Sequence, residues 1–408
     1  MSDIASAGDL PLSGIRVADF GWILAAPHAT AWLGALGADV IRVENSRHAD
    51  LGRFLGGTDG KMGINRGGGF HAINFSKRSI ALDLGTASGA AIARRLVAIS
   101  DIVVENFATG TMRRFGLDYE ALRGSRPGLI MLSATPLGQT GPFAAAVGYG
   151  PHTQAFSGIC ELTGYPGGDP CGLGGAWPDF EVGVLMVVAI MAAIHYRDRT
   201  GEGQYIDLSI AEAMTAAIPE AMMDYFMNGR VQRPIGNRDP EIAPHGVFPC
   251  AGEDRWVAFA AVSDAEFALL CETLGAPGMA QDARYGTMHG RLANVEALER
   301  ELALLTRRFE RDQLVEALRT RKLAAGPVYN TAEVVADPAF VASKVGLRLN
   351  HKEVGERLVP GLPANFSGFA PMYRAAPALG EHTDEVLVDL LGYSSGEISR
   401  LREEGVIG

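Results

Sequence analysis

Short apolar segments that alternate with longer amphipathic ones run through the first third of the chain, and this alternation constrains the fold more than any other feature. The predicted strands cover residues 14–20, 38–44, 79–84, 102–105 and 129–133, and helices are predicted over residues 27–36 and 88–99. Strands that are joined through helices lie parallel, with the helices packed on both faces of the sheet. The pattern therefore predicts an α/β fold with a Rossmann-like parallel sheet.

The length of 408 residues exceeds what one hydrophobic core usually supports, so we expect two domains. A polar stretch rich in proline and glycine near residues 228–240 is a candidate linker. We predict a large domain over residues 1–227, a small α+β domain with its linker over residues 228–325, and a return of the chain over residues 326–408 that completes the large domain. The glycine-rich residues 56–69 are predicted to form a long loop.

The composition excludes several classes of partner. A formal net charge of -11 gives no support to the binding of nucleic acid or of anionic membranes, because both require a basic surface. The cysteines lack Cys-x-x-Cys spacing and the histidines lack His-Glu-x-x-His spacing, so neither a disulfide framework nor a metal site is expected. The first residues lack the basic and apolar regions of a secretory signal, and we expect a cytoplasmic protein with no membrane partner.

A single carboxylate precedes the longest apolar run in the chain. Residues 182–194 contain no polar side chain, which predicts a helix that is buried on all sides. The run is shorter than the ~20 residues needed to cross a bilayer. Asp179 stands at its start, where free backbone N–H groups and the helix dipole keep a carboxylate ionised. Asp179 is therefore either a nucleophile or base, or an ordinary helix cap.

Two pairs of cations stand beside predicted strand ends. Lys77 and Arg78 enter one strand, while Arg113 and Arg114 follow another, with Phe107 between that strand and its cations. Cations at matching edges of one sheet are candidate phosphate ligands, and Phe107 is a candidate to stack on a base. Each pair alone is equally compatible with a solvated surface. The glycine fingerprint of a dinucleotide site is missing between the first strand and helix.

Six segments in sequence order resemble one enzyme family over essentially the full length, from residue 12 to residue 407. They are residues 11–17, 36–44, 76–80, 104–107, 199–207 and 376–383. In these segments the chain resembles the family III CoA-transferases, which include formyl-CoA, carnitine and benzylsuccinate CoA-transferases and the related α-methylacyl-CoA racemases. The resemblance implies the transfer of CoA from an acyl-CoA to a free carboxylic acid, and an interlaced homodimer in which each chain threads through the other.

The resemblance also implies roles for individual residues. Asp179 matches the family nucleophile, which forms an aspartyl anhydride and then an aspartyl-CoA thioester, and so splits one difficult exchange into easier steps. The resemblance also implies contacts to coenzyme A, and these agree with the phosphate cradle predicted from the cations, which includes Lys77 and Arg78. They are Ile23, Leu24, Ala25, Asn45, Leu82, Asp83, Leu84, Gly85, Asn106, Phe107, Ala108 and Arg114.

Departures from the family pattern keep two alternatives open. The racemases carry a Gly-His-Asp segment where this chain has Gly148-Tyr149-Gly150, so Tyr149 and the nearby His152 are candidate substrate contacts and a racemase-type epimerase is one alternative. The segments 178–180 and 236–246 look closer to benzylsuccinate-type transferases, which often pair a catalytic subunit with a related one. A heteromer and a non-catalytic CoA-binding subunit of such a heteromer therefore remain open. The same likeness suggests a dicarboxylic or aromatic acid as acceptor. Arg238 or His245 is the predicted partner of the substrate carboxylate.

Overall fold

The computed structural model describes residues 10–57 and 60–408, so the first nine residues of the predicted large domain and two residues of the predicted 56–69 loop lie outside the described residues. The chain divides into two compact units. The larger unit contains the chain up to Cys160 together with Gly172–Arg230 and Ala342–Gly408, and the smaller unit contains Glu161–Cys171 and Val231–Val341. Each unit is described here by itself.

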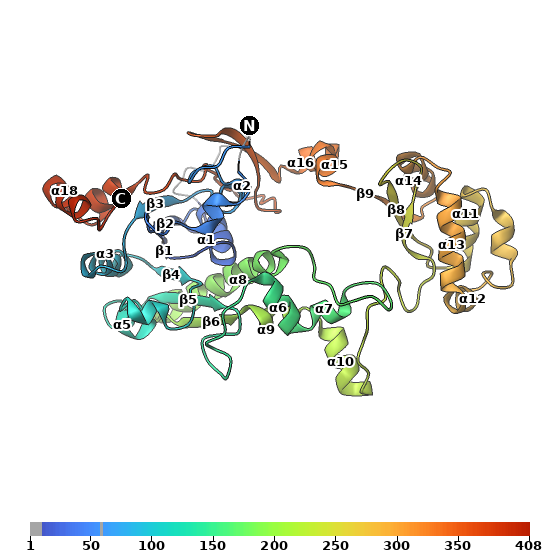
Figure 1. Ribbon diagram of the computed structural model, residues 1–408, viewed down its shortest axis with the longest axis horizontal. Coiled ribbons are helices and arrows are strands. Elements are labelled where there is room, and N and C mark those ends of the chain that lie inside the picture. The colour runs from blue at the N-terminus through green and yellow to red at the C-terminus, as the bar shows by residue number, and fades with distance from the viewer. Residues whose placement is uncertain (1–9, 58–59) are drawn as a thin grey trace. The chain divides into compact units, whose positions relative to one another are not determined.

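A six-stranded parallel sheet forms the centre of the larger unit, in the order β3-β2-β1-β4-β5-β6 (Figure 1). This sheet confirms the predicted α/β fold. Its strands are β1 (Arg16–Asp19), β2 (Asp39–Glu44), β3 (Arg78–Ala81), β4 (Ile102–Glu105), β5 (Ile130–Thr135) and β6 (Tyr205–Ser209). The sequence did not predict β6, which lies at the edge of the sheet and alternates exposed residues with partly buried ones before the buried Ser209.

Helices cover both faces of this sheet, because successive side chains of each strand enter different cores. Val17 of β1 packs in a core with α1 and α8, while Ala18 packs on the other face with α3 and the C-terminal segment. The helices of this unit before the C-terminal segment are α1 (Ala25–Ala35), α2 (Gly68–Ile73), α3 (Ala87–Ala98), α4 (Thr111–Arg114), α5 (Tyr119–Arg123), α6 (Gly150–Ser157), α8 (Trp177–Thr200), α9 (Ile210–Ala216) and α10 (Pro219–Asn228).

The C-terminal segment returns to the larger unit and ends against the parallel sheet. It contains the antiparallel strands β10 (Gly346–His351) and β11 (Gly355–Pro360), and then α17 (Thr383–Glu385), a π-helical turn (Val386–Leu390) and α18 (Ser395–Glu403). Ile407 forms an isolated bridge with Leu82, and the N–H of Asp83 donates to the carbonyl of Val406 at 2.8 Å. The last residues of the chain therefore lie beside the segment that follows β3.

The smaller unit contains an antiparallel sheet in the order β7-β8-β9, packed against helices. Its elements are β7 (His245–Pro249), β8 (Trp256–Ala260), α11 (Asp264–Thr273), α12 (Met288–Ala293), α13 (Val295–Thr306), α14 (Arg311–Thr320), β9 (Ala324–Val328) and α15 (Thr331–Ala336). The helices α7 (Ile159–Leu162) and α16 (Pro338–Ser343) lie where the chain passes between units. Because β9 pairs with β8, the small unit passes the predicted boundary at residue 325, and its last residue is Val341.

Helix α8 differs from the prediction of a helix buried on all sides. Val182, Met186 and Ile190 are buried in the core with α1, but Val188 is 60% exposed and Leu185 and Met191 are also exposed. An apolar helix sequence therefore does not guarantee burial on all sides: in the single chain one face of α8 is exposed. Among the described residues, α8 is the one helix long and apolar enough to cross a membrane by length and composition, a criterion that core helices of folded domains also meet.

Candidate active site

Asp179 lies in the first turn of α8, which begins at Trp177 and carries Pro178 as an early residue. Its own N–H donates to the carbonyl of Ala176 at 3.0 Å, which fixes the backbone of this turn. The side chain is half-buried, and no ion pair to Asp179 occurs among the described residues. Asp179 is therefore an uncompensated carboxylate at a helix start.

Burial raises the pKa of Asp179 to about 6, against a smaller lowering by a backbone hydrogen bond. The sequence predicted a carboxylate stabilised by the helix start, but the loss of water around the carboxylate outweighs that stabilisation. At pH 7 a group with this pKa is still ionised in about nine molecules of ten. A poorly solvated carboxylate with no cation beside it combines ionisation with reactivity, as a nucleophile requires.

Gly150, at the start of α6, provides the space in which the Asp179 carboxylate lies. A Cβ placed on Gly150 would stand 2.7 Å from Asp179 Oδ2, which no real contact allows. The neighbouring Tyr149 is exposed, and its N–H donates to Nδ1 of His152 at 3.2 Å. His152 therefore interacts with the start of its own helix, and the Gly148-Tyr149-Gly150 segment supplies room for Asp179 in place of a second acid or base.

A cavity of about 390 Å³ lies beyond the carboxyl ends of β2, β3 and β4. Several of the predicted coenzyme A contacts line it together: Asn45 after β2, Leu82, Asp83, Leu84 and Gly85 after β3, and Phe107 after β4. The carboxyl ends of parallel strands meet at one edge of a sheet, where ligands of such folds bind. The structure thus brings segments more than 60 residues apart to one candidate nucleotide site.

The same cavity contains residues that the sequence did not single out. They are Trp22, Val43, Glu44, Arg47, His48, Thr111 and Phe115. Arg47 forms a long ion pair with Asp83 at 3.6 Å, but its side chain is 63% exposed, so its guanidinium can still be reached by an anion. Its position three residues beyond the end of a predicted strand was the available signal. Arg114 does not line the cavity, and its guanidinium donates to Thr111 at 3.0 Å.

Asn106, Leu24, Ala25 and Ala108 surround the cavity without lining it. Asn106 exchanges two hydrogen bonds with Trp22, accepting from its N–H at 2.7 Å and donating to its carbonyl at 2.9 Å. Leu24 and Ala25 mark the start of α1. Ala108 lines a neighbouring cavity with Glu105, where burial raises the pKa of Glu105 to about 7.

Lys77 is not placed to bind phosphate, which corrects the sequence-based expectation. Its side chain is fully buried, and Nζ donates to Asp19 at 2.9 Å, to Asn74 at 2.9 Å and to the carbonyl of Pro27 at 2.8 Å. An ammonium group has three donors, and all three are used. Lys77 belongs to a fully buried cluster in which three cations balance three carboxylates: Arg42, Arg53, Lys77, Asp19, Glu44 and Asp50.

Arg78 lies at the wrong end of its strand for the predicted cradle. It begins β3 and pairs with Asp39, which begins β2, at 2.6 Å. Arg113 and Arg114 instead follow the carboxyl end of β4. In a parallel sheet the amino ends of all strands lie on one side and the carboxyl ends on the other, so the two cation pairs do not form one site.

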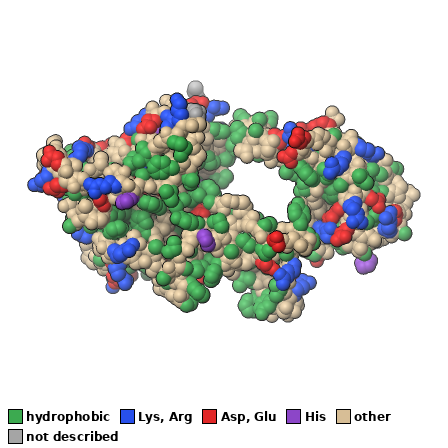
Figure 2. Space-filling model, viewed as in Figure 1, with side chains coloured by type: hydrophobic (Ala, Val, Ile, Leu, Met, Phe, Trp, Pro, Cys, Tyr) green, Lys and Arg blue, Asp and Glu red, His purple; other side chains and the backbone are tan. Residues whose placement is uncertain are grey.

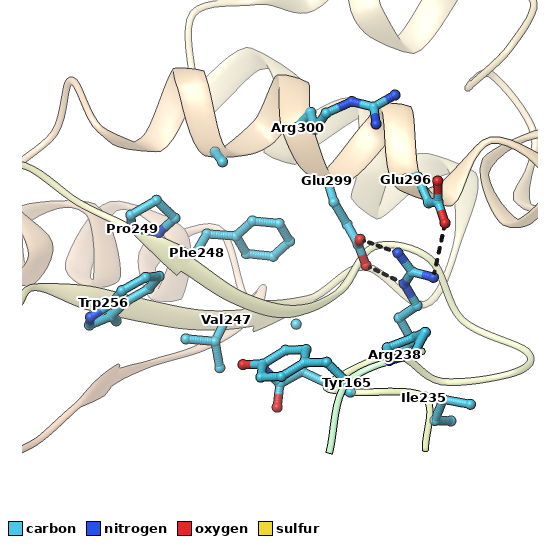
Figure 3. Close-up of a pocket in the computed structure, with 15 residues that line it drawn as sticks. Tyr165, Ile235, Arg238, Val247, Phe248, Pro249, Trp256, Glu296, Glu299 and Arg300 are labelled. Atoms are coloured by element: carbon cyan, nitrogen blue, oxygen red, sulfur yellow. Dashed lines mark hydrogen bonds and ion pairs between the residues drawn. The ribbon is translucent and has the colours of Figure 1, made fainter. Parts of the chain in front are cut away.

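Arg238 and His245 belong to the smaller unit, where a cavity of about 480 Å³ is lined by Arg238, Phe248, Trp256 and Tyr165 (Figure 3). Arg238 donates to both carboxylate oxygens of Glu299, at 2.9 and 2.7 Å, so its charge is already paired. Nδ1 of His245 lies 2.7 Å from the carbonyl oxygen of Asn237. Arg238 therefore offers no free positive charge to a substrate carboxylate, contrary to the prediction, and Nδ1 of His245 is occupied by its own loop. Figure 3 shows Arg300 with no interaction to the other residues drawn.

Comparison with known proteins decides the family. The sequence model of "CoA-transferase family III" matches residues 12–383. The chain belongs to CoA-transferase family III. It is 38% identical over 386 residues to the succinate–glutarate CoA-transferase of Agrobacterium fabrum, covering 93% of this chain and 96% of that protein. It is 33% identical to the succinyl-CoA–L-malate CoA-transferase alpha subunit of Chloroflexus aurantiacus, with coverage of 98% and 93%.

A solved structure supports the same assignment. The crystal structure of a CaiB/BaiF family protein from Brucella suis superposes with a TM-score of 0.86 at 35% identity, covering 93% of this chain and 99% of the other. The family III enzyme described here is thus a CoA-transferase with acyl-CoA as a co-substrate. No cluster of three or more metal-ligating side chains occurs among the described residues of the chain.

Proposed function

We propose that this enzyme transfers CoA from succinyl-CoA to a second dicarboxylic acid, with Asp179 as the nucleophile. The observation that carries the role of Asp179 is its geometry: an unpaired, half-buried carboxylate at the start of α8, in the space that Gly150 leaves open. The donor and acceptor classes are supported by relatives that act on succinyl-CoA, succinate, glutarate or L-malate. These names favour a short dicarboxylic acid over an aromatic or benzylsuccinate-type acceptor.

The proposed chemistry proceeds in four balanced steps. A carboxylate oxygen of Asp179 attacks the thioester carbon and the C–S bond breaks. CoA departs as the thiolate, and the acyl group stays on Asp179 as a mixed anhydride. The thiolate then attacks the aspartyl carbon and releases the donor acid, which leaves an aspartyl-CoA thioester. The acceptor carboxylate attacks this thioester and expels the thiolate, which finally attacks the acyl carbon of the second anhydride to form product and restore the Asp179 carboxylate.

The cavity beyond β2, β3 and β4 is the proposed site for the nucleotide end of CoA. Its Phe107 and Trp22 rings supply apolar and aromatic surface for a base, and Arg47 supplies an accessible cation for phosphate. The segment Trp22–Ala25 leads from this cavity to the start of α1, and α1 packs along α8, which carries Asp179. A pantetheine arm would follow this path.

We also propose that the chain works as a dimer or with a related subunit. The exposed apolar side chains of α8 and α10 support an additional protein contact, and in Figure 2 hydrophobic side chains gather around α10. They include Leu185, Val188, Met191, Met223, Phe226 and Met227. One relative is named as an alpha subunit, which supports a heteromer equally well. Light scattering of the purified chain distinguishes the two, and the cytoplasmic location stays a prediction.

Trapping the covalent intermediate tests the proposed function. Wild-type enzyme incubated with succinyl-CoA and then hydroxylamine should carry an aspartyl hydroxamate on the peptide that contains Asp179, detected by mass spectrometry. Asp179→Ala should abolish the adduct, while Glu181→Gln, two residues further along the helix, should retain it. Binding of CoA without labelling of the wild type would overturn the proposal in favour of a non-catalytic CoA-binding subunit. Exchange of the α-hydrogen in deuterated water, without any adduct, would instead support racemisation.

A further inference from the structure

Ile23 adopts a backbone conformation that its side chain opposes. Its φ is +58°, in the left-handed region that β-branched residues strongly disfavour. Ile23 lies between β1 and α1 at the carboxyl edge of the sheet, directly after Trp22, which lines the candidate nucleotide cavity. Strained residues of this kind persist only where the surrounding structure enforces them, and they cluster at ligand sites.

Three side chains hold the strained segment, each through one backbone N–H. Asp19 Oδ1 accepts from Gly21 at 2.8 Å, and Asn106 Oδ1 accepts from Trp22 at 2.7 Å. Both carboxylate oxygens of Asp50 accept from Ile23, at 3.1 Å each. The three acceptors come from the ends of β1 and β4 and from the segment after β2, so the conformation of this loop is imposed by the sheet edge.

Asp50 has the geometry of a fixed anchor. It is fully buried, accepts from the N–H of Gly52 at 2.8 Å, and forms a close ion pair with the guanidinium of Arg42. Arg42 is itself fully buried and lies near Asp19 and Glu44. The carboxylate of Asp50 is thus prevented from turning away from Ile23, and it is shielded from any ligand in the cavity.

We propose that Asp50 is a positioning residue for CoA, which acts by holding Ile23 in its left-handed conformation. The held conformation sets the orientation of the Trp22 ring in the nucleotide cavity and of the Ile23–Leu24 peptide at the start of α1. This inference rests on the proposed function, since it takes the Trp22–Ala25 segment as the wall along which CoA binds. Without Asp50, Ile23 relaxes toward negative φ and the wall changes shape.

The test combines loss of the anchor with removal of the strain. Asp50→Asn replaces one of the two accepting oxygens with a donor, so we expect the KM for succinyl-CoA and the Kd for CoA to rise about tenfold, with a smaller change in kcat. Ile23→Gly removes the strain, because glycine adopts positive φ freely, but it also removes a side chain of the proposed wall, so its own Kd for CoA is the reference value for the double variant. The double variant Asp50→Asn/Ile23→Gly should recover most of the lost affinity, which a general loss of stability would not allow.

A matched control and a second background keep this test decisive. Asp39→Asn removes a carboxylate that pairs with Arg16 and Arg78 at the opposite edge of the sheet, and its KM should equal that of the wild type. Asp50→Asn could fail to fold because Arg42 loses its partner. In that case the background is Arg42→Met/Asp50→Asn, which leaves no unpaired guanidinium, and it is compared with and without Ile23→Gly.

Two results would overturn the inference. One is an unchanged Kd for CoA in the anchor variant, and the other is a double variant that binds no better than the anchor variant alone. Labelling of Asp179 separates this failure from failure of the proposed function. The wild type and the Asp50 variant should both form the adduct at saturating succinyl-CoA, whereas a wild type that never forms it contradicts the proposed function alone.

Discussion

Asp50 and Asp179 both lie beside a helix start in the larger unit, and their surroundings differ in burial and in charge pairing. Asp50 is fully buried, accepts hydrogen bonds from two backbone N–H groups and pairs with Arg42. Asp179 is half-buried with no cationic partner, and burial raises its pKa to about 6. A compensated carboxylate maintains structure because its interactions are saturated, whereas an uncompensated one retains a lone pair for chemistry. Substitutions at paired and unpaired charges should therefore separate stability from activity.

The largest effect is expected at the unpaired carboxylate. Asp179→Asn preserves the shape of the side chain but removes the nucleophile, so turnover should fall by on the order of 10⁴-fold or more. Isothermal calorimetry should show nearly unchanged CoA binding, because the nucleotide cavity is untouched. Turnover within tenfold of the wild type would contradict the distinction between the two aspartates.

The largest effect of removing the paired cation Arg42 should be on stability. Arg42→Met leaves Asp50, Glu44 and Asp19 with less positive charge in a buried site, which typically costs about 3–5 kcal/mol. Urea unfolding followed by circular dichroism measures this loss. A variant of Arg42 that is as stable as the wild type would show that the buried cluster does not depend on its charge balance.

Gly150→Ala tests the space around Asp179. The added Cβ would stand 2.7 Å from Asp179 Oδ2, so the carboxylate must move. A displacement of about 1 Å at a reacting group can cost on the order of 10²-fold in rate, and we expect kcat to fall by about that factor. Gly174→Ala is the matched control, since a Cβ there meets no atom within 4 Å. Equal kcat values for the two variants would refute the packing argument.

The pH dependence follows from the raised pKa of Asp179. Only the ionised form attacks, so the rate of adduct formation should fall about tenfold for each pH unit below 6 and become level above it. For stability the direction is opposite. Between the ordinary pKa of an aspartate carboxyl, 3.8, and about 6, the unfolded chain loses its proton first, so stability falls as pH rises through this window. Stopped-flow rates and thermal unfolding measure the two effects, and Asp179→Asn should remove both.

The exposed cation Arg47 should have the smallest effect. Arg47→Ala removes a solvent-accessible partner for phosphate, and interactions at such positions amount to ~2–5-fold in affinity. The KM for succinyl-CoA should rise by this factor at low salt and approach the wild-type value at high salt, because exposed charges are screened. Unfolding in urea should not change. A salt-independent KM ratio would place the phosphate away from Arg47.

Local pattern was sufficient to predict five of the six strands of the parallel sheet, β1 to β5. The strand over residues 102–105 matches β4, and the second predicted strand differs from β2 by a single residue, because buried parallel strands read as short apolar runs between helices. The edge strand β6 was missed since its exposed side chains carry no such signal. The small unit extends past residue 325 because β9 pairs with β8, a contact that no local pattern reveals.

The candidate site was predicted less evenly. Asp179 follows from its place before an apolar helix and from the family resemblance, and the residues after β2, β3 and β4 follow from the topology of a parallel sheet. Arg78 was misassigned because the cations before one strand and after another were taken to meet at matching edges, and Lys77 because its burial against Asp19 depends on contacts distant in sequence. The contact of Asp50 with Ile23 spans 27 residues and involves a positive φ at isoleucine, which residue preferences argue against.

The docking of Val406 and Ile407 against the segment after β3 has a consequence for how the protein is made. Ribosomes release the amino-terminal strands first, and domains usually fold as they emerge. Here Val406 and Ile407 support Leu82 and Asp83 although they lie far along the chain from them, so the segment after β3 has no backing until both are synthesised. A polypeptide that lacks Val406 and Ile407 should therefore bind CoA more weakly in the proposed nucleotide cavity.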